Sequence, residues 1–316
     1  MNKTIANKIK NLLPADLFIV EDELRAEIKN LEKQLLRYQL GWEPGHFYSP
    51  IPALDEIKKN EHKIWKEIPK EIQGINLQEQ AQIKLLKQLS AFYKLQPWKD
   101  DKQDSLRYYF NNPNYPHGES IILFCLLMHI QPKKVIEIGS GYSSCVILDT
   151  NELFFNDAID TIFIEPYPDL FFSLIKSHDK DNITIISDKL QDADPEVFAS
   201  LSSGDIVLID STHVSKVDSD VNHILFSILP KIAPGVYIHF HDIFYPFEYP
   251  KKWIYEGRFW NELYILRAFL QYNNEFEIVL FNSYVGYFFK ETLLQQMPLC
   301  INPGTSIWLR KKHASE

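Results

Sequence analysis

The chain has 316 residues, of which 45% are hydrophobic and 24% are charged, and this composition supports a sizeable core without disulfides or a structural metal. The formal net charge of -9 argues against a nucleic-acid substrate, because phosphate binding relies on clusters of Lys and Arg. The three cysteines lie far apart in the sequence, which fits neither a disulfide framework nor a zinc knuckle and is typical of a reducing compartment.

Targeting and membrane signals are weak. The apolar stretch from Leu12 to Val20 is interrupted by Pro14 and Asp16, so we expect no export signal. The longest apolar run, Ile121 to Ile130, has about half of the roughly 20 residues that a membrane-spanning helix needs. The sequence therefore predicts a cytoplasmic protein with no membrane partner.

Residues 1–110 are expected to form a helical N-terminal region that acts as a cap or a dimerisation element. The apolar residues of the first predicted helix, Asp22 to Leu40, recur at helical spacing. They are Leu24, Ile28, Leu31, Leu35 and Tyr38. This narrow stripe predicts docking either on the chain's own domain or on a second copy, as a homodimer. An ordered aromatic loop is expected over 41–52 and a further helix over 78–95.

Residues 111–316 are expected to form an α/β domain, because from Lys134 onward short β-branched runs alternate with helix-length segments. This pattern predicts a Rossmann-like, mostly parallel sheet with helices on both faces. The seven expected strands are 135–138, 161–165, 183–187, 206–210, 236–241, 276–281 and 306–309. The helices expected between them are 144–151, 169–177, 195–201, 219–229 and 261–272.

The first turn from strand to helix carries a candidate cofactor loop, Glu137-Ile-Gly139-Ser140-Gly141. Glycines suit a tight turn that approaches a ligand, and Glu165, at the end of the next strand, is placed to accept hydrogen bonds from ribose hydroxyls. One alternative is an ordinary turn. Another is an NAD-type dinucleotide site, but Ser144 stands where its motif has a third glycine, and the acidic Glu137 suits a cationic ligand better.

These motifs resemble those of the class I S-adenosylmethionine (SAM) dependent methyltransferases over roughly Tyr115 to Leu309. The resemblance implies that Glu137, Gly139, Ser140 and Gly141 hold the methionine part of SAM. It also implies that Glu165 holds the ribose and that Asp188 lies near the adenine. Several further segments are similar to an uncharacterised bacterial subgroup of this family. They are 45–50, 210–216, 241–250 and 260–262.

Two later strand ends bring together Asp210, His213, His241 and Asp242 as candidate catalytic residues. Such a cluster suits a general base acting on a hydroxyl, or a divalent cation that acidifies it. It is similar to the O-methyltransferase branch in which D-x-x-H follows the fourth strand. That resemblance implies Asp210 and Asp242 as magnesium ligands and His213 as base. His241 replaces a carboxylate of that branch, which weakens the magnesium case; Asp210 can equally bond the amino group of SAM. For His239 we expect a packing role.

Aromatic residues crowd the predicted loop between Phe244 and Trp260. They predict either a pocket wall for a small hydroxylated molecule or glycan, or a lid or dimer seam. The residues expected to line such a pocket are His46, Tyr48, Tyr245, Trp253 and Trp260. The favoured function is SAM-dependent O-methylation of a small molecule or sugar. The alternatives are an NAD-type oxidoreductase and a non-catalytic SAM-binding or assembly protein.

Overall fold

The computed structural model describes residues 23–32, 35, 42 and 44–313. The chain separates into two compact units between Lys66 and Glu67. The sequence groups residues 67–110 with the N-terminal region, but in the structure they belong to the sheet-bearing unit. Long-range hydrogen bonds account for this, because Trp98 Nε1 and Arg107 Nη1 each donate to the buried carboxylate of Asp149 at 2.8 Å.

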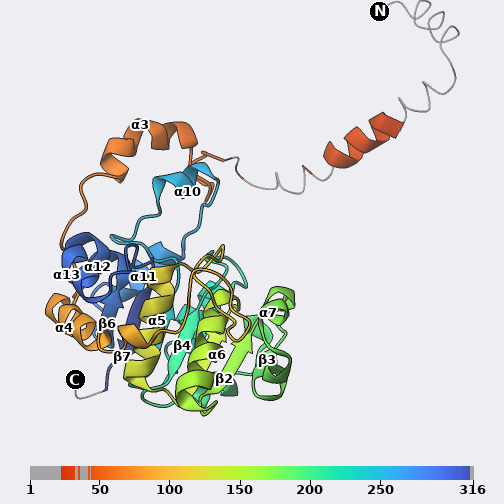
Figure 1. Ribbon diagram of the computed structural model, residues 1–316. Helices are drawn as coiled ribbons and strands as arrows, with labels where there is room; N and C mark the ends of the chain where they lie inside the picture. The colour runs from red at the N-terminus through yellow and green to blue at the C-terminus, as the bar shows by residue number, and fades with distance from the viewer. Residues whose placement is uncertain (1–22, 33–34, 36–41, 43, 314–316) are drawn as a thin grey trace, which may run out of the picture. The chain divides into compact units, whose positions relative to one another are not determined.

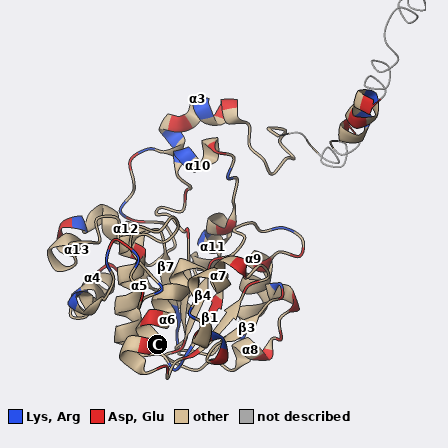
Figure 2. Ribbon diagram, turned by 45° about the vertical axis from the view of Figure 1, so that its right-hand side comes forward, with Lys and Arg blue, Asp and Glu red and all other residues tan. Residues whose placement is uncertain are grey.

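The first unit contains the predicted amphipathic helix, which is helical over 23–32. Its apolar side chains Leu24, Ile28 and Leu31 are all exposed. Asp22, Tyr38 and Leu40 lie outside the described residues, as does the apolar stretch from Leu12 to Val20. The predicted loop is closed by a hydrogen bond of 2.9 Å from Gly45 N to Ile51 O. A helix not expected from the sequence, α3 (Leu54–Ile64), carries charges of both signs (Figure 2).

The second unit is built on a sheet of seven strands in the order β3-β2-β1-β4-β5-β7-β6. The first five strands are parallel, and β7 is antiparallel to both of its neighbours. The strands are β1 (Lys134–Ile138), β2 (Asp160–Ile164), β3 (Thr184–Ile186), β4 (Ile206–Ile209), β5 (Tyr237–Phe240), β6 (Phe276–Phe281) and β7 (Ile307–Lys311). All seven strands predicted from the sequence are present.

Continuous apolar runs make the central strands. Every residue of β4 is buried, and in β1 only Lys134 is not, because helices cover both faces of a parallel sheet. The strand order reverses between β1 and β4. Because connections between parallel strands are right-handed, the helices that connect β1 to β3 and those that follow β4 lie on opposite faces of the sheet.

The helices of this unit mostly follow the strands. They are α4 (Glu79–Leu89), α5 (His117–Ile130), α6 (Tyr142–Phe155), α7 (Asp169–Leu174), α8 (Glu196–Ala199), α9 (Asp220–His223), α10 (Lys251–Tyr255), α11 (Glu262–Leu270), α12 (Asn282–Phe288) and α13 (Lys290–Gln296). Short 3-10 turns lie at Tyr93–Leu95, Ser177–Asp181 and Leu190–Asp192, and one π-helical turn at Ile224–Ile228. Helices α5 and α6 pack side by side over one face of the sheet (Figure 1).

Helix α5 explains the longest apolar run of the sequence. Ten of its 14 residues are buried, from Gly118 to Leu127, so the run is a core helix between α4 and α6. In the described part of the chain, no helix combines the length and the apolar character that a membrane span requires.

Candidate active site

Four predicted site residues lie side by side because hydrogen bonds continue the sheet just past the strand ends. The backbone N–H groups of Gly139, Glu165, Asp210 and His241 donate to the last residues of β2, β3, β1 and β4. Each of these bonds is 2.9 to 3.0 Å long. The carboxyl ends of β1, β2, β4 and β5 thus form one edge at the strand-order reversal, where open α/β sheets bind their ligands.

Contacts with buried groups of the domain fix the conformation of the loop after β1. Gly139 adopts a φ of +83°, and an added Cβ would meet the carbonyl oxygen of Asp210 at 2.5 Å. Ser144 Oγ accepts a hydrogen bond of 3.0 Å from Gly141 N and donates a short one to the carboxylate of Glu137. Burial raises the pKa of Glu137 to about 8. Glu137 therefore supports the loop from beneath rather than facing solvent.

A cavity of about 420 Å³ opens along this edge, within the usual size range of ligand sites. Gly139, Glu165 and Asp210 line it, as the sequence predicts. The Glu165 carboxylate accepts hydrogen bonds from Ser140 N at 3.2 Å and Tyr167 N at 2.8 Å. The remaining polar lining comes mostly from two segments that the sequence analysis did not assign, 189–191 and 216–220.

Two details of the loop fit a bound nucleoside such as SAM. Gly141 has an extended backbone, with φ of 178°, and an added Cβ would meet no protein atom within 4 Å. The protein's own packing therefore does not require glycine there, whereas a ligand lying against the backbone would. Ser140 Oγ is buried without a hydrogen-bond partner in the structure, which leaves one polar group for such a ligand.

Asp188, the residue predicted near the adenine, is exposed. It is not part of the cavity lining, whereas the next three residues, Lys189 to Gln191, are. The cavity is thus lined by the residues that follow Asp188, and a role of Asp188 beside the adenine stays a prediction.

His213 is clamped between carboxylates next to the cavity. Its Nδ1 lies 2.8 Å from Glu262 Oε2, and its Nε2 lies 3.3 Å from Asp210 Oδ1 and 3.9 Å from Asp242 Oδ2. The Trp260 ring stacks on the imidazole with centroids 4.3 Å apart. The backbone of His213 has a φ of +59°, a conformation that non-glycine residues adopt at a cost, typically at functional sites.

The opposite charges of this cluster shift the pKa values of His213 and Asp210. Burial alone would lower the pKa of His213, but its bonds to Asp210 and Glu262 outweigh burial and raise it to about 10. Desolvation likewise opposes ionisation of Asp210, yet His241 and His213 together hold its pKa below the usual value. These contacts favour the protonated imidazolium form of His213, which lies between acidic neighbours.

The predicted magnesium ligands, Asp210 and Asp242, come from neighbouring strand ends. Asp242 has a φ of +54° and accepts a hydrogen bond of 3.0 Å from Thr305 Oγ1. The donor set fits magnesium poorly. Both carboxylates face the cationic His213. The residue beside Asp242 in the chain is His241, whose imidazole offers nitrogen, whereas magnesium prefers oxygen ligands.

Among the predicted substrate residues, the structure places Tyr245 away from the cavity surface. Tyr245 is 2% exposed and donates its hydroxyl to Pro69 O at 2.8 Å, so it packs in the core. The aromatic segment is not a simple loop, since α10 lies within it. Trp253 and Trp260 are half-buried and meet edge to face at 5.3 Å. His46 and the exposed Tyr48 belong to the first unit, and their role in substrate binding stays a prediction.

Sequence reasoning missed Glu262, because it stands more than 45 residues from its partner His213 and opens a helix, where an acidic residue is common. The motif Trp260-Asn-Glu262 was the only available signal. Helix α11 begins there, and Asn261 N and Glu262 N both donate to His213 O at 3.1 Å. The helix start and the imidazole are thus fixed to each other.

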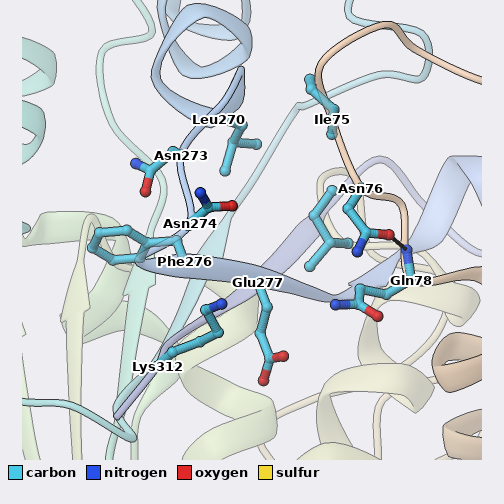
Figure 3. A pocket seen from close by; sticks show the side chains of 10 residues that line it. Ile75, Asn76, Gln78, Leu270, Asn273, Asn274, Phe276, Glu277 and Lys312 are labelled. Carbon is cyan, nitrogen blue, oxygen red and sulfur yellow. Dashed lines mark hydrogen bonds between the residues drawn. The ribbon is translucent and has the colours of Figure 1, made fainter. Parts of the chain in front are cut away.

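A second cavity lies near the start of β6 and is far smaller, about 50 Å³. Figure 3 shows Asn76 and Gln78 on one side of it and Phe276 and Lys312 on the other. Asn76 Oδ1 accepts a hydrogen bond of 3.1 Å from Gln78 N. This space is well below the roughly 300 Å³ at which ligand pockets begin, so it suits water and not a nucleoside.

Several solved structures share weak similarity with this chain. The SAH-bound methyltransferase PaMTH1 of Podospora anserina is 12% identical, with a TM-score of 0.43 over 82% of this chain and 95% of its own. An apo structure of CmcI-N160 is 16% identical, with a TM-score of 0.41 over 71% and 84%. A putative O-methyltransferase from Klebsiella pneumoniae is 12% identical, with a TM-score of 0.39 over 82% and 97%.

Sequence comparison gives a more direct result. An uncharacterised protein of Archaeoglobus fulgidus is 33% identical over 168 residues, which are 50% of this chain and 72% of that protein. A family model described as a methyltransferase domain matches residues 136–243, the stretch from β1 to just past β5 that carries the cavity lining, His213, Asp210 and Asp242. By its strand order, its cofactor loop and this match, the chain belongs to the class I SAM-dependent methyltransferases.

Proposed function

We propose that this methyltransferase transfers the methyl group of SAM to a hydroxyl oxygen of a small-molecule or sugar acceptor, with His213 as the proton acceptor. The observation that supports this most is the Glu262–His213 pair beside the cavity. Nδ1 is held by Glu262 at 2.8 Å. Nε2 is therefore directed toward Asp210, which lines the cavity.

The binding roles are drawn from the cavity lining and from the loop that follows β1. When bound, SAM supplies a methyl group on a cationic sulfur, which is already a strong electrophile. The protein then has to align the acceptor and take up its proton. We assign Gly139, Ser140 and Gly141 to the methionine part and Glu165 to the ribose. Asp210 serves the positively charged end of the cofactor.

His213 must lose its proton before it can act as a base. Its hydrogen bond with Asp210 contributes to the raised pKa of His213. A positive charge bound beside Asp210 would offset that carboxylate and lower the pKa of His213 toward neutrality. Cofactor binding would thereby prepare Nε2 to accept a proton, while Glu262 keeps the ring oriented through Nδ1.

The acceptor would meet aromatic surface. Trp260 covers the His213 ring and contacts Trp253 and Tyr249 edge to face. Indole faces stack on sugar C–H surfaces and on planar rings. A panel of nucleotide sugars, glycans and small phenols tests the acceptor class with SAM as donor. Transfer to phenols alone would contradict a sugar acceptor, and transfer to amines alone would contradict O-methylation.

His213→Gln tests the proposed base. Loss of general-base catalysis costs about 10²- to 10⁴-fold in rate, so turnover should fall by that factor. SAM affinity, measured by calorimetry with NAD as the negative control, should not fall, because the cavity lining is intact and Gln removes the positive charge beside Asp210. Unchanged turnover would remove His213 from the mechanism.

The same turnover assays, run with added magnesium and with a chelator, test whether Asp210 and Asp242 act as magnesium ligands.

Glu262→Gln is the companion variant, because Gln keeps the size of the side chain and removes its charge. As a positioning residue, Glu262 should affect turnover and its pH profile together, with the acidic limb, where His213 takes up a proton, displaced to lower pH relative to the unmodified enzyme. A merely structural role would leave that limb unmoved.

A further inference from the structure

Glu119, His239 and His241 form a cluster of side chains with metal-ligand chemistry that the proposed reaction does not use. Glu119 lies on α5, His239 is in β5, and His241 follows that strand. Their ligand atoms all lie within 4.8 Å of one another, and in the described part of the chain no other group of three does so. The cluster is well buried, with Glu119 at 2% and His239 at 3% exposure.

The imidazoles are short of partners. Both ring nitrogens of His239 and Nδ1 of His241 are buried without a hydrogen bond in the structure. A buried polar group left unpaired costs roughly 1–3 kcal/mol. His239 packs against the Trp308 ring, with centroids 4.8 Å apart. A phenylalanine would fill that space without the penalty, so packing alone does not account for a histidine.

The carboxylate is oriented by its surroundings. Glu119 accepts short hydrogen bonds from Thr305 N and Ser306 Oγ and one of 3.3 Å from Asn282 Nδ2. Gly304 leaves room for it, since an added Cβ would lie 2.1 Å from the carboxyl carbon. Outer hydrogen bonds of this kind commonly fix metal-ligating carboxylates. Its Oε1 lies 3.9 Å from His241 Nδ1.

We propose that Glu119, His239 and His241 bind a divalent transition metal ion, with Zn²⁺ as the representative. Two imidazoles and one carboxylate are the donors that such ions share, whereas magnesium prefers an all-oxygen set. The site is distinct from Asp210 and Asp242, which contribute no ligand to it. It would tie α5 to the end of β5, beside Asp242, whose Oδ1 lies 3.6 Å from His241 Nε2.

The test uses the full chain, stripped with a chelator and then titrated with ZnCl₂ or MgCl₂. We expect one zinc per chain by elemental mass spectrometry, a rise in Tm with zinc, and zinc binding at least roughly 100-fold tighter than magnesium binding. If the purified chain takes up no zinc and its Tm does not change, a buried water or nothing occupies the cluster, and the proposal fails.

His239→Phe separates metal binding from folding. It keeps an aromatic ring against Trp308 and removes both unpaired nitrogens, so the Tm of the metal-free variant should equal or exceed that of the unmodified chain. Its zinc affinity should fall by about 100-fold or more, and the zinc-induced rise in Tm should vanish. SAM binding by His239→Phe should persist, and this serves as the control that the variant is folded.

His129→Phe is the matched control. It makes the same substitution at a histidine of α5, the helix that carries Glu119, but His129 is exposed and lies outside the cluster. It should keep one zinc per chain. Undiminished zinc in His239→Phe would place the ion elsewhere and overturn the assignment. Asp210→Asn, by contrast, should leave the zinc stoichiometry unchanged.

Discussion

Gly139 and Gly141 stand two residues apart in one loop, yet they are glycines for different reasons. Gly139 needs glycine because its φ is +83° and because Asp210 O lies where a Cβ would be. Gly141 has neither constraint from the protein itself. A ligand lying against the backbone of Gly141 would explain why this position has no side chain.

Alanine substitutions should therefore separate the two positions. Gly139→Ala should lower the free energy of unfolding by about 2 kcal/mol or more, from the left-handed backbone and the clash, and should lose SAM binding. Gly141→Ala should leave the denaturation midpoint unchanged but weaken SAM binding roughly 5- to 150-fold, if a methyl group intrudes on the ligand. Unchanged affinity in Gly141→Ala would show that the cofactor does not approach this residue.

Glu137 gives the site a pH dependence. Its pKa is raised by burial from 4.5 to about 8, so between these values the native state keeps a proton that the unfolded chain has lost. Stability should decline as the pH rises through this window. Glu137→Gln mimics the protonated acid, so the difference between its unfolding free energy and that of the unmodified chain should grow from pH 4.5 to pH 8. A constant difference, measured by urea denaturation across that range, would mean that Glu137 is ionised in the native state.

At the scale of elements, the segment before α5 is anchored by one buried carboxylate. Asp149 on α6 accepts hydrogen bonds from Trp98 Nε1, from the backbone N–H groups of Arg107 and Tyr108, and from Arg107 Nη1. Arg107 is 3% exposed and also pairs with Asp179. None of these long-range pairs follows from local sequence pattern.

Asp149→Asn removes the charge from this buried network at nearly constant volume. Breaking a buried ion pair costs about 3–5 kcal/mol, and we expect a loss of that order in the free energy of unfolding, measured by urea denaturation. Asp157→Asn on the exposed turn after α6 is the control. Its φ of +58° suits asparagine, so its stability should be within about 0.5 kcal/mol of the unmodified chain. Equal effects in the two variants would contradict the anchoring role of Asp149.

Helix α5 was missed as an element because it is apolar on nearly all sides. A helix packed between two others has no polar face, so its sequence lacks the 3.6-residue alternation that reveals surface helices. Helices α12 and α13 were missed as well. The long predicted helix over 219–229 begins as α9 and continues as a π-helical turn.

At the scale of the whole molecule, the compact sheet unit begins at Glu67, whereas the sequence suggests a boundary near residue 110. Two fragments test which boundary defines the folding unit. Residues 67–316 should unfold cooperatively and bind SAM, because they contain the whole sheet and the Arg107 network. Residues 111–316 should unfold at a lower temperature or aggregate, since they leave Asp149 buried without its partners. Equal Tm values for the two fragments would favour the boundary near 110.

The sequence by itself determined the seven strands, the loop between Glu137 and Gly141 and the carboxylate at Glu165. These depend on local features, namely apolar runs of strand length and the backbone freedom of glycine, which the chain carries wherever it folds. It also predicted that Asp210, His213, His241 and Asp242 lie close together, because strand ends of a parallel sheet meet at one edge.

Only the tertiary structure decided which side chains meet from distant segments. It paired His213 with Glu262, put Tyr245 in the core rather than at the cavity, and brought Glu119 on α5 to His239 on β5. Such contacts depend on how helices cross the sheet, and the spacing of residues along one element carries no record of the neighbour that packs against it.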